Sequence, residues 1–234
     1  MESRSEEVRI EGKDGPMGAH LALPAGQGPF PAVIVAMEAF GLNDHIRSVA
    51  DRIANEGYVA IAPDFYHRSS DRVASYSDLP KAIGLMRELS DERILADVDA
   101  VLGLLRRRSD VRGDRIGITG FCMGGRVSFL TACERDVAAS APFYGGGIGG
   151  LLDHAERISA PMVLFFGEKD GFIPLAEVDR VQARLAELGK DAEVIVYPGA
   201  DHGFFCDERP SYQAAAAADA WTRLLALFAK TLRK

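Results

Sequence analysis

The chain has 234 residues, a length that suits one sizeable α/β domain. Hydrophobic residues make up 47% of the chain and charged residues 26%, which excludes disordered, collagen-like and coiled-coil compositions. Lys and Arg number 27 against 34 Asp and Glu, and the resulting net charge of -7 argues against a nucleic-acid-binding surface. We therefore expect a soluble protein with a single domain over residues 1–234.

The start of the chain and the cysteine count bear on the cellular compartment. The first ten residues, MESRSEEVRI, are charged and lack the apolar stretch of a secretory signal, and no apolar run elsewhere is long enough to span a membrane. Three cysteines without a CxxC pair fit a reducing compartment and predict neither a disulfide framework nor a zinc site. We expect a cytoplasmic protein with no membrane partner and no metal.

Strand-like and helix-like segments alternate along most of the chain. Strand-like pieces at 6–10 and 19–24 flank the turn-forming GKDG and predict an antiparallel hairpin at one sheet edge. Further strands are expected at 31–37, 58–64, 114–120, 137–145, 160–167 and 192–199. Helices are expected at 44–56, after a Ser90 cap, after residue 122, at 174–189 and at 211–232.

This alternation predicts the fold class α/β, with a mostly parallel central sheet and helices on both faces. Residues 145–150, GGGIGG, are interpreted as a loop after a strand. They do not form the G-x-G-x-x-G turn that opens a helix after the first strand of a dinucleotide site. No cofactor is therefore expected.

The stretch GITGFCMGGRVSF runs from a β-branched strand through a tight turn into a helix. That context is typical of a nucleophile elbow, in which glycines flank a side chain exposed on a strained turn. Cys122 occupies the place that serine usually holds, between Gly120 and Gly124, and Gly125 would let the helix pack closely on the sheet. The alternative for Cys122 is a small buried hydrophobic residue, as is common for free cysteines.

Two further residues favour the catalytic interpretation. Asp170 and His202 each lie in a loop that follows an expected strand, so the chain order is nucleophile, acid, histidine, as in α/β-hydrolases. Alternatively, Asp170 could simply form a turn and His202 could be an exposed loop residue. Loops after parallel strands meet at the carboxyl edge of the sheet, where the three side chains can converge.

The chemistry explains these residue types. A thiol is a weak nucleophile until it is deprotonated, so Cys122 needs a base, which His202 would supply, while Asp170 would orient and stabilise the imidazole. The helix that follows Cys122 adds a positive dipole end. The backbone N–H groups of Met123 and Ala39 are the candidates for an oxyanion hole.

These residues resemble the dienelactone hydrolase family, also called carboxymethylenebutenolidase-like, within the α/β-hydrolase fold. The likeness covers nearly the whole chain and rests on MEAFGLN, PDFY, GFCMGG, FYGGG, GEKDGFIP and ADHGF. The resemblance implies that Glu38 contacts the cysteine and helps to deprotonate it when substrate binds. The alternative is that Glu38 is a solvated loop carboxylate.

The sequence departs from the family where substrate is held. The family binds the substrate carboxylate with arginines, one of them four residues beyond the histidine, and that position here is Cys206. Arg209 or Arg68 could substitute, and the alternative for each is a plain surface arginine. Aromatic residues near the motif loops are candidates to line the substrate pocket, with plain packing as the alternative: Phe40, Tyr144, Phe172 and Phe204.

We therefore predict hydrolysis of a lactone, ester or thioester through an acyl-enzyme on Cys122, with specificity altered from that of dienelactone hydrolase. A thioesterase, a peptidase-like hydrolase or an acyl transferase would use the same three residues. A hydrolytic dehalogenase does not fit, because that chemistry needs a carboxylate nucleophile. The alternative outside the enzymes is a catalytically silent α/β-hydrolase that serves as a ligand-binding or regulatory protein. Monomer and small homo-oligomer both remain open.

Overall fold

The computed structural model describes residues 3–234. The chain divides into two compact units, Met1–Gly117 and Ile118–Lys234, and β5 (Val111–Phe121) is the strand in which one unit gives way to the next. Each unit is described by itself below. The single domain expected over the whole chain stays a prediction.

The first unit is built on a mixed sheet with the strand order β1-β2-β4-β3. Strands β1 and β2 form the expected antiparallel hairpin, β2 also runs antiparallel to β4, and β3 is parallel to β4. The hairpin places β1 at the sheet edge, which confirms that prediction. The bounds are β1 Arg4–Gly12, β2 Gly15–Leu23, β3 Phe30–Ala36 and β4 Val59–Pro63.

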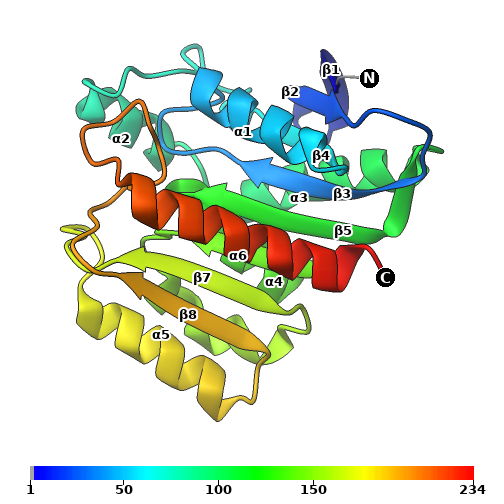
Figure 1. Ribbon diagram of the computed structural model, residues 1–234. Coiled ribbons are helices and arrows are strands. Elements are labelled where there is room, and N and C mark those ends of the chain that lie inside the picture. Colours follow the sequence, from blue (N-terminus) through cyan, green and yellow to red (C-terminus); the bar gives the residue numbers. More distant parts are fainter. Residues whose placement is uncertain (1–2) are drawn as a thin grey trace. The chain divides into compact units, whose positions relative to one another are not determined.

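Three helices accompany this sheet: α1 Asp44–Asn55, α2 Leu79–Arg87 and α3 Asp91–Arg107. Helix α1 packs across β2, β3 and β4, while α3 packs against β1 (Figure 1). The Ser90 hydroxyl accepts the Arg93 N–H and caps α3, as expected. Helix α2 was not expected, because only Ala82 and Leu85 are buried in it and its apolar stripe is too narrow to predict a helix.

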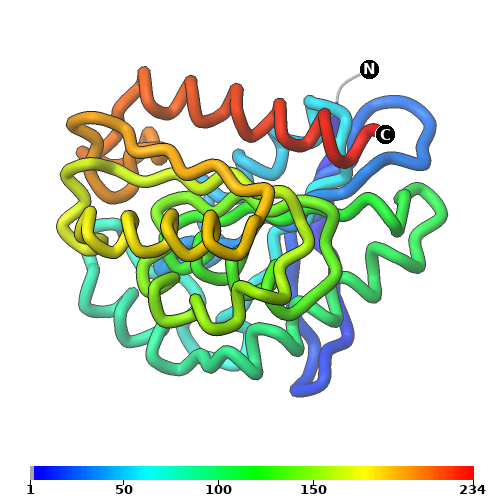
Figure 2. The backbone as a smooth tube through the Cα atoms, turned by 90° about the horizontal axis from the view of Figure 1, so that it is seen from below, coloured from blue at the N-terminus to red at the C-terminus, as the bar shows by residue number. Residues whose placement is uncertain are grey.

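The second unit contains parallel strands in the order β5-β6-β7-β8. Helix α6 packs on β6 and β7, and α4 also packs on β6. Figure 2 shows α5 and α6 on opposite sides of β8, so helices cover both faces of this sheet as expected. The bounds are β6 Ala139–Phe143, β7 Met162–Gly167, β8 Ala192–Tyr197, α4 Met123–Glu134, α5 Leu175–Glu187, α6 Ala214–Leu232 and the 3-10 helix η1 Ile148–Arg157.

Two sequence expectations in this unit need correction. The glycine-rich loop ends at Gly147, because η1 begins at Ile148 and buries Ile148, Leu151 and Ala155 along one side. Helix α6 begins at Ala214 instead of residue 211, since turns occupy the preceding residues and the Gln213 N–H donates to the Phe204 carbonyl. Across residues 3–234, no helix is both long and apolar enough to cross a membrane.

Candidate active site

Cys122 lies at the junction between β5 and α4. Its φ of 56° is in the left-handed region, which a residue with a side chain seldom adopts, and its N–H donates to the Phe143 carbonyl at 3.0 Å. Cys122 is half-buried, whereas Cys133 and Cys206 are buried. The geometry is that of a strained strand-to-helix turn that presents its side chain.

Gly125 permits a close contact directly behind this turn. A Cβ atom at residue 125 would lie 2.3 Å from the Phe143 carbonyl oxygen and 2.9 Å from the Gly145 Cα. No side chain can occupy that space, so the first turn of α4 packs backbone to backbone against the end of β6. This is the close helix packing that the sequence predicted for Gly125.

Asp170 follows β7 and uses both of its carboxylate oxygens. Oδ1 accepts the N–H groups of Phe172 at 2.8 Å and Ile173 at 3.1 Å. Oδ2 accepts from Nδ1 of His202 at 2.8 Å, and the Asp170 side chain has no exposed surface. Asp170 therefore forms the turn and holds the histidine at the same time.

The loops that carry Asp170 and His202 are joined through their backbones. The Glu168 N–H donates to the Tyr197 carbonyl at 3.0 Å, and the Lys169 N–H donates to the Ala200 carbonyl at 2.8 Å. These contacts extend the parallel pairing of β7 and β8 beyond the ends of both strands. The separation between acid and histidine is thus set by main-chain hydrogen bonds.

His202 is buried, with 8% of its side chain exposed. Burial, the largest single influence, lowers the pKa of His202, but hydrogen bonds and charge from Asp170 and Cys122 outweigh it and raise the pKa to about 10. The imidazole therefore interacts with both residues and is held in its protonated form at neutral pH. The structure brings Cys122, Asp170 and His202 together.

The aromatic candidates in this unit differ in exposure. Tyr144 is fully buried with a φ of 35°, and its ring lies edge-on to that of His202 with centroids 5.1 Å apart. Phe172 is 63% exposed, and its ring lies 5.0 Å from that of His202. Phe204 is fully buried between the rings of Tyr144 and Tyr197. The exposed position of Phe172 beside His202 suits a residue that meets substrate.

Cys206 and Arg209, which both follow His202 in the chain, bear on the carboxylate-binding arginine that the sequence lacks. Cys206 is fully buried. The guanidinium of Arg209 lies against Gly203, because a Cβ atom there would meet Nη1 of Arg209 at 2.2 Å. Arg209 thus places a cation next to the loop that carries His202. Arg68, the other candidate, is held in a bidentate ion pair by Asp97, at 2.7 and 2.8 Å.

The remaining predicted site residues follow β3 in the first unit. Glu38 is fully buried, and its Oε2 accepts the hydroxyl of Tyr76 at 2.9 Å, so it is not a solvated carboxylate. Ala39 is 4% exposed, and its carbonyl accepts the Tyr66 hydroxyl at 2.9 Å. Phe40 is 3% exposed and packs edge-on against Tyr76 with ring centroids 4.7 Å apart.

Met123 is the first residue of α4, and N–H groups in the first turn of a helix have no acceptor within the helix. Its place at the start of α4 fits the oxyanion donor predicted for it, and that role stays a prediction. The sequence did not predict two residues near Glu38. Tyr76 donates a hydrogen bond to Glu38, and Asn43 donates one to Tyr76. Tyr76 lies 38 residues from Glu38, and no motif in the sequence joins the two.

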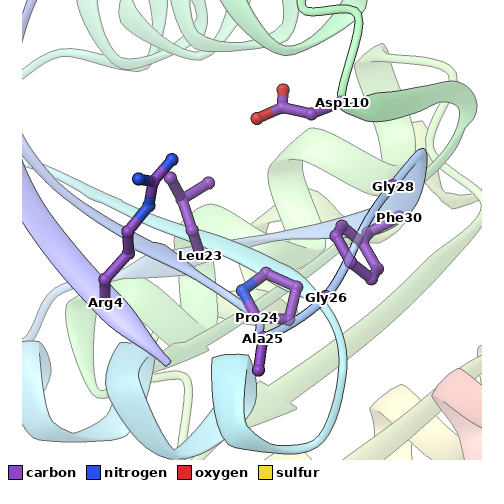
Figure 3. Close-up of a pocket in the computed structure, with 8 residues that line it drawn as sticks. All are labelled: Arg4, Leu23, Pro24, Ala25, Gly26, Gly28, Phe30 and Asp110. Atoms are coloured by element: carbon purple, nitrogen blue, oxygen red, sulfur yellow. The ribbon is translucent and has the colours of Figure 1, made fainter. Parts of the chain in front are cut away.

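A separate hollow of about 360 Å³ lies in the first unit (Figure 3). Its walls combine the apolar Leu23, Pro24 and Phe30 with the charged Arg4 and Asp110. Both carboxylate oxygens of Asp110 are bound by Arg108, which lowers the pKa of that carboxyl. The hollow has no nucleophile or histidine in its lining, so it is not a second candidate for the triad.

Within the described part of the chain, no three His, Cys, Asp or Glu residues are grouped so that they could hold a metal ion. The expectation that catalysis needs no metal stays a prediction.

Comparison with known proteins identifies the family. The model of the dienelactone hydrolase family matches residues 17–232. A candidate carboxymethylenebutenolidase of Synechocystis is 37% identical over 238 residues, covering 97% of this chain and 96% of the relative. The crystal structure of a candidate dienelactone hydrolase from Klebsiella pneumoniae is 36% identical, with a TM-score of 0.91 over 98% of this chain and 100% of that chain.

A more distant structure matches over the same length. It is a phosphotriesterase from metagenomic libraries, described as promiscuous and dienelactone hydrolase-like, with 25% identity, a TM-score of 0.86 and 99% coverage of both chains. These similarities confirm the predicted α/β-hydrolase fold and show that the chain is an enzyme of the carboxylic ester hydrolase class. The chain therefore belongs to the dienelactone hydrolase family.

Proposed function

We propose that this enzyme hydrolyses lactones or esters, thioesters among them, through a covalent acyl-enzyme on Cys122, with His202 as acid and base and Asp170 as its orienting partner. One observation carries the proposal. The half-buried thiol on a strained turn interacts with a histidine that a buried carboxylate holds at 2.8 Å. A protein that only binds a ligand has no need of this arrangement.

Acylation begins when the Cys122 thiol gives its proton to His202, a transfer that the raised pKa of His202 favours. The Cys122 sulfur attacks the carbonyl carbon, a C–S bond forms, and the carbonyl electron pair moves to oxygen. When the tetrahedral intermediate collapses, the C–O bond breaks and His202 gives its proton to the leaving oxygen. In a lactone the alcohol so formed stays attached to the acyl group.

Deacylation uses the same histidine as a base. Once Cys122 is acylated, its charge and its hydrogen bond no longer raise the pKa of His202, and burial, which lowers the pKa, is opposed by Asp170 alone. His202 then accepts a proton from water while the water oxygen attacks the thioester. The C–S bond breaks, and the thiolate and imidazolium are restored.

Backbone donors would stabilise the oxyanion in both steps. We assign this role to the N–H groups of Met123 and Ala39, the first from the helix that follows the nucleophile and the second from the loop after β3. The resemblance to the family also implies a role for Glu38 in drawing the proton from the thiol. Its complete burial and its position as a hydrogen-bond acceptor support that assignment.

Substrate specificity is proposed to differ from that of dienelactone hydrolase. Cys206 stands where the family resemblance implies an arginine, and it is buried. Arg209, which lies on Gly203, is the cation that would meet a substrate carboxylate here. Phe172 would contact the apolar part of the substrate.

The test compares the wild type with Cys122→Ala and His202→Ala on p-nitrophenyl acetate and on a cis-dienelactone. We expect turnover by the wild type and the loss of most activity in both variants. The ratio of the turnover rates on the two substrates reports whether the absence of the arginine at residue 206 matters. Faster turnover of the dienelactone would contradict an altered specificity. Equal inactivity of all three proteins would favour the silent ligand-binding alternative. Equal activity of all three would overturn the roles given to Cys122 and His202.

A further inference from the structure

Glu38 is one end of a chain of hydrogen bonds that begins at helix α1. Asn43 caps this helix, with its Oδ1 accepting the Ile46 N–H at 3.1 Å. The Asn43 amide nitrogen donates to the Tyr76 hydroxyl at 2.9 Å, and that hydroxyl donates to Oε2 of Glu38 at 2.9 Å. Two side chains thus join a fully buried carboxylate to the start of a helix.

The helix cap fixes the direction of every bond in this chain. Since an N–H can only donate, the amide oxygen of Asn43 must face Ile46, and its NH₂ group must face Tyr76. The Tyr76 oxygen therefore receives a hydrogen bond from Asn43, and its single proton is left for Glu38. Oε2 of Glu38 is consequently held as a hydrogen-bond acceptor.

Tyr76 is itself anchored on the loop that contains Glu38. The loop after β4 pairs with the loop after β3 through a bridge between Gly41 and Val73, and the Ala74 N–H donates to the Phe40 carbonyl at 3.0 Å. The ring of Tyr76 packs edge-on against Phe40. These contacts leave the hydroxyl little freedom to point elsewhere.

We infer that Tyr76 and Asn43 are positioning residues that keep the carboxylate of Glu38 oriented as a proton acceptor. A buried carboxylate loses the stabilisation that water would give its charge. A hydroxyl aimed at one oxygen, and polarised by the amide behind it, replaces part of that stabilisation. This inference rests on the function proposed above, because it is through Glu38 that the two residues would affect Cys122.

Two substitutions interrupt this series of hydrogen bonds at different places while keeping the local packing. Tyr76→Phe retains the ring against Phe40 and removes the hydroxyl. Asn43→Asp still accepts the Ile46 N–H and caps α1, but it offers Tyr76 an oxygen and draws the tyrosine proton away from Glu38. Asp78→Asn is the matched control, since Asp78 caps α2 by accepting the Lys81 N–H at 3.1 Å and has an exposed side chain.

We expect Tyr76→Phe and Asn43→Asp each to lower kcat about tenfold, with KM within about twofold and the melting temperature near that of the wild type. The Asp78→Asn control should keep wild-type kcat. The double variant should lose no more kcat than either single variant, because both substitutions break the same series of hydrogen bonds to Glu38. In a Glu38→Gln background, Tyr76→Phe should have no further effect on kcat.

The inference is overturned if both single variants keep wild-type kcat while Cys122→Ala is inactive, which leaves the proposed function standing. It is also overturned if Tyr76→Phe costs as much in the Glu38→Gln background as in the wild type. Full activity of Cys122→Ala would overturn the proposed function and this inference together. Should Tyr76→Phe unfold, Asn43→Asp decides alone, because its helix cap is retained.

Discussion

His202 is subject to opposing influences that the other residues of the site control. Burial favours the neutral imidazole, while Asp170 and Cys122 favour the cation, and the cation prevails because the pKa is raised to about 10. Asp170 can exert this effect because its other oxygen is fixed by the N–H groups of Phe172 and Ile173. A carboxylate held at both oxygens cannot turn away from the histidine.

Removing the Asp170 charge should therefore lower the pKa of His202. In Asp170→Asn, we expect an NMR titration to place the pKa of His202 well below about 10, and kcat to fall by about 100-fold or more. Asp201→Asn is the matched control, because Asp201 accepts the backbone N–H of His202 at 2.6 Å and does not bind its ring. An unchanged titration in Asp170→Asn would contradict the role given to this carboxylate.

At the scale of elements, the position of Cys122, the proposed nucleophile, depends on how α4 meets the end of β6. The Cys122 N–H binds the Phe143 carbonyl, and the missing side chain of Gly125 lets the helix approach that same carbonyl. The sequence predicted this contact because a glycine-flanked turn between a strand and a helix has few possible geometries. Any atom added at residue 125 would push the turn away from β6.

Gly125→Ala should accordingly destabilise the protein by about 1–3 kcal/mol and reduce esterase activity, since the new methyl group would overlap the Phe143 oxygen. Gly84→Ala in α2 is the matched control. A Cβ at Gly84 would meet nothing within 4 Å, so this helical glycine should gain up to about 1 kcal/mol on substitution. Urea unfolding measures both, and equal effects of the two substitutions would contradict the packing argument.

At the scale of the whole molecule, most regular elements apart from α2 and η1 could be predicted from the sequence, and so could the order of the proposed site residues. Buried strands, capped helices and loops after strands are local patterns, and they predict where Cys122, Asp170 and His202 lie in the fold. Asp170 and His202 come into contact because the loops after parallel strands β7 and β8 share one edge of a sheet.

Contacts between irregular segments could not be predicted in this way. The hydrogen bond from Tyr76 to Glu38 joins two loops, and the position of Arg209 over Gly203 depends on turns that carry no periodic signal. The 3-10 helix was missed because its glycine-rich start is typical of loops, while its burial depends on packing against α4 and α5. Such features depend on tertiary contacts that no local pattern encodes.

The raised pKa of His202 also has a consequence for the stability of the whole molecule. The folded protein holds the His202 proton up to about pH 10, whereas the unfolded chain releases it near pH 6.5. The stabilisation from this proton is therefore complete below about pH 6.5 and is lost as the pH rises to about 10. This sign is opposite to that of a carboxylate with a lowered pKa, whose contribution is lost on acidification.

Urea unfolding of the wild type and Asp170→Asn between pH 6 and 10.5 tests this linkage, because other titrating groups cancel in the comparison. We expect the wild type to lose more unfolding free energy than the variant between pH 7 and 10, by roughly a few kcal/mol. The two curves should converge at the alkaline end, where His202 is neutral in both proteins. Parallel curves over the whole range would mean that Asp170 does not hold the His202 proton in the folded state.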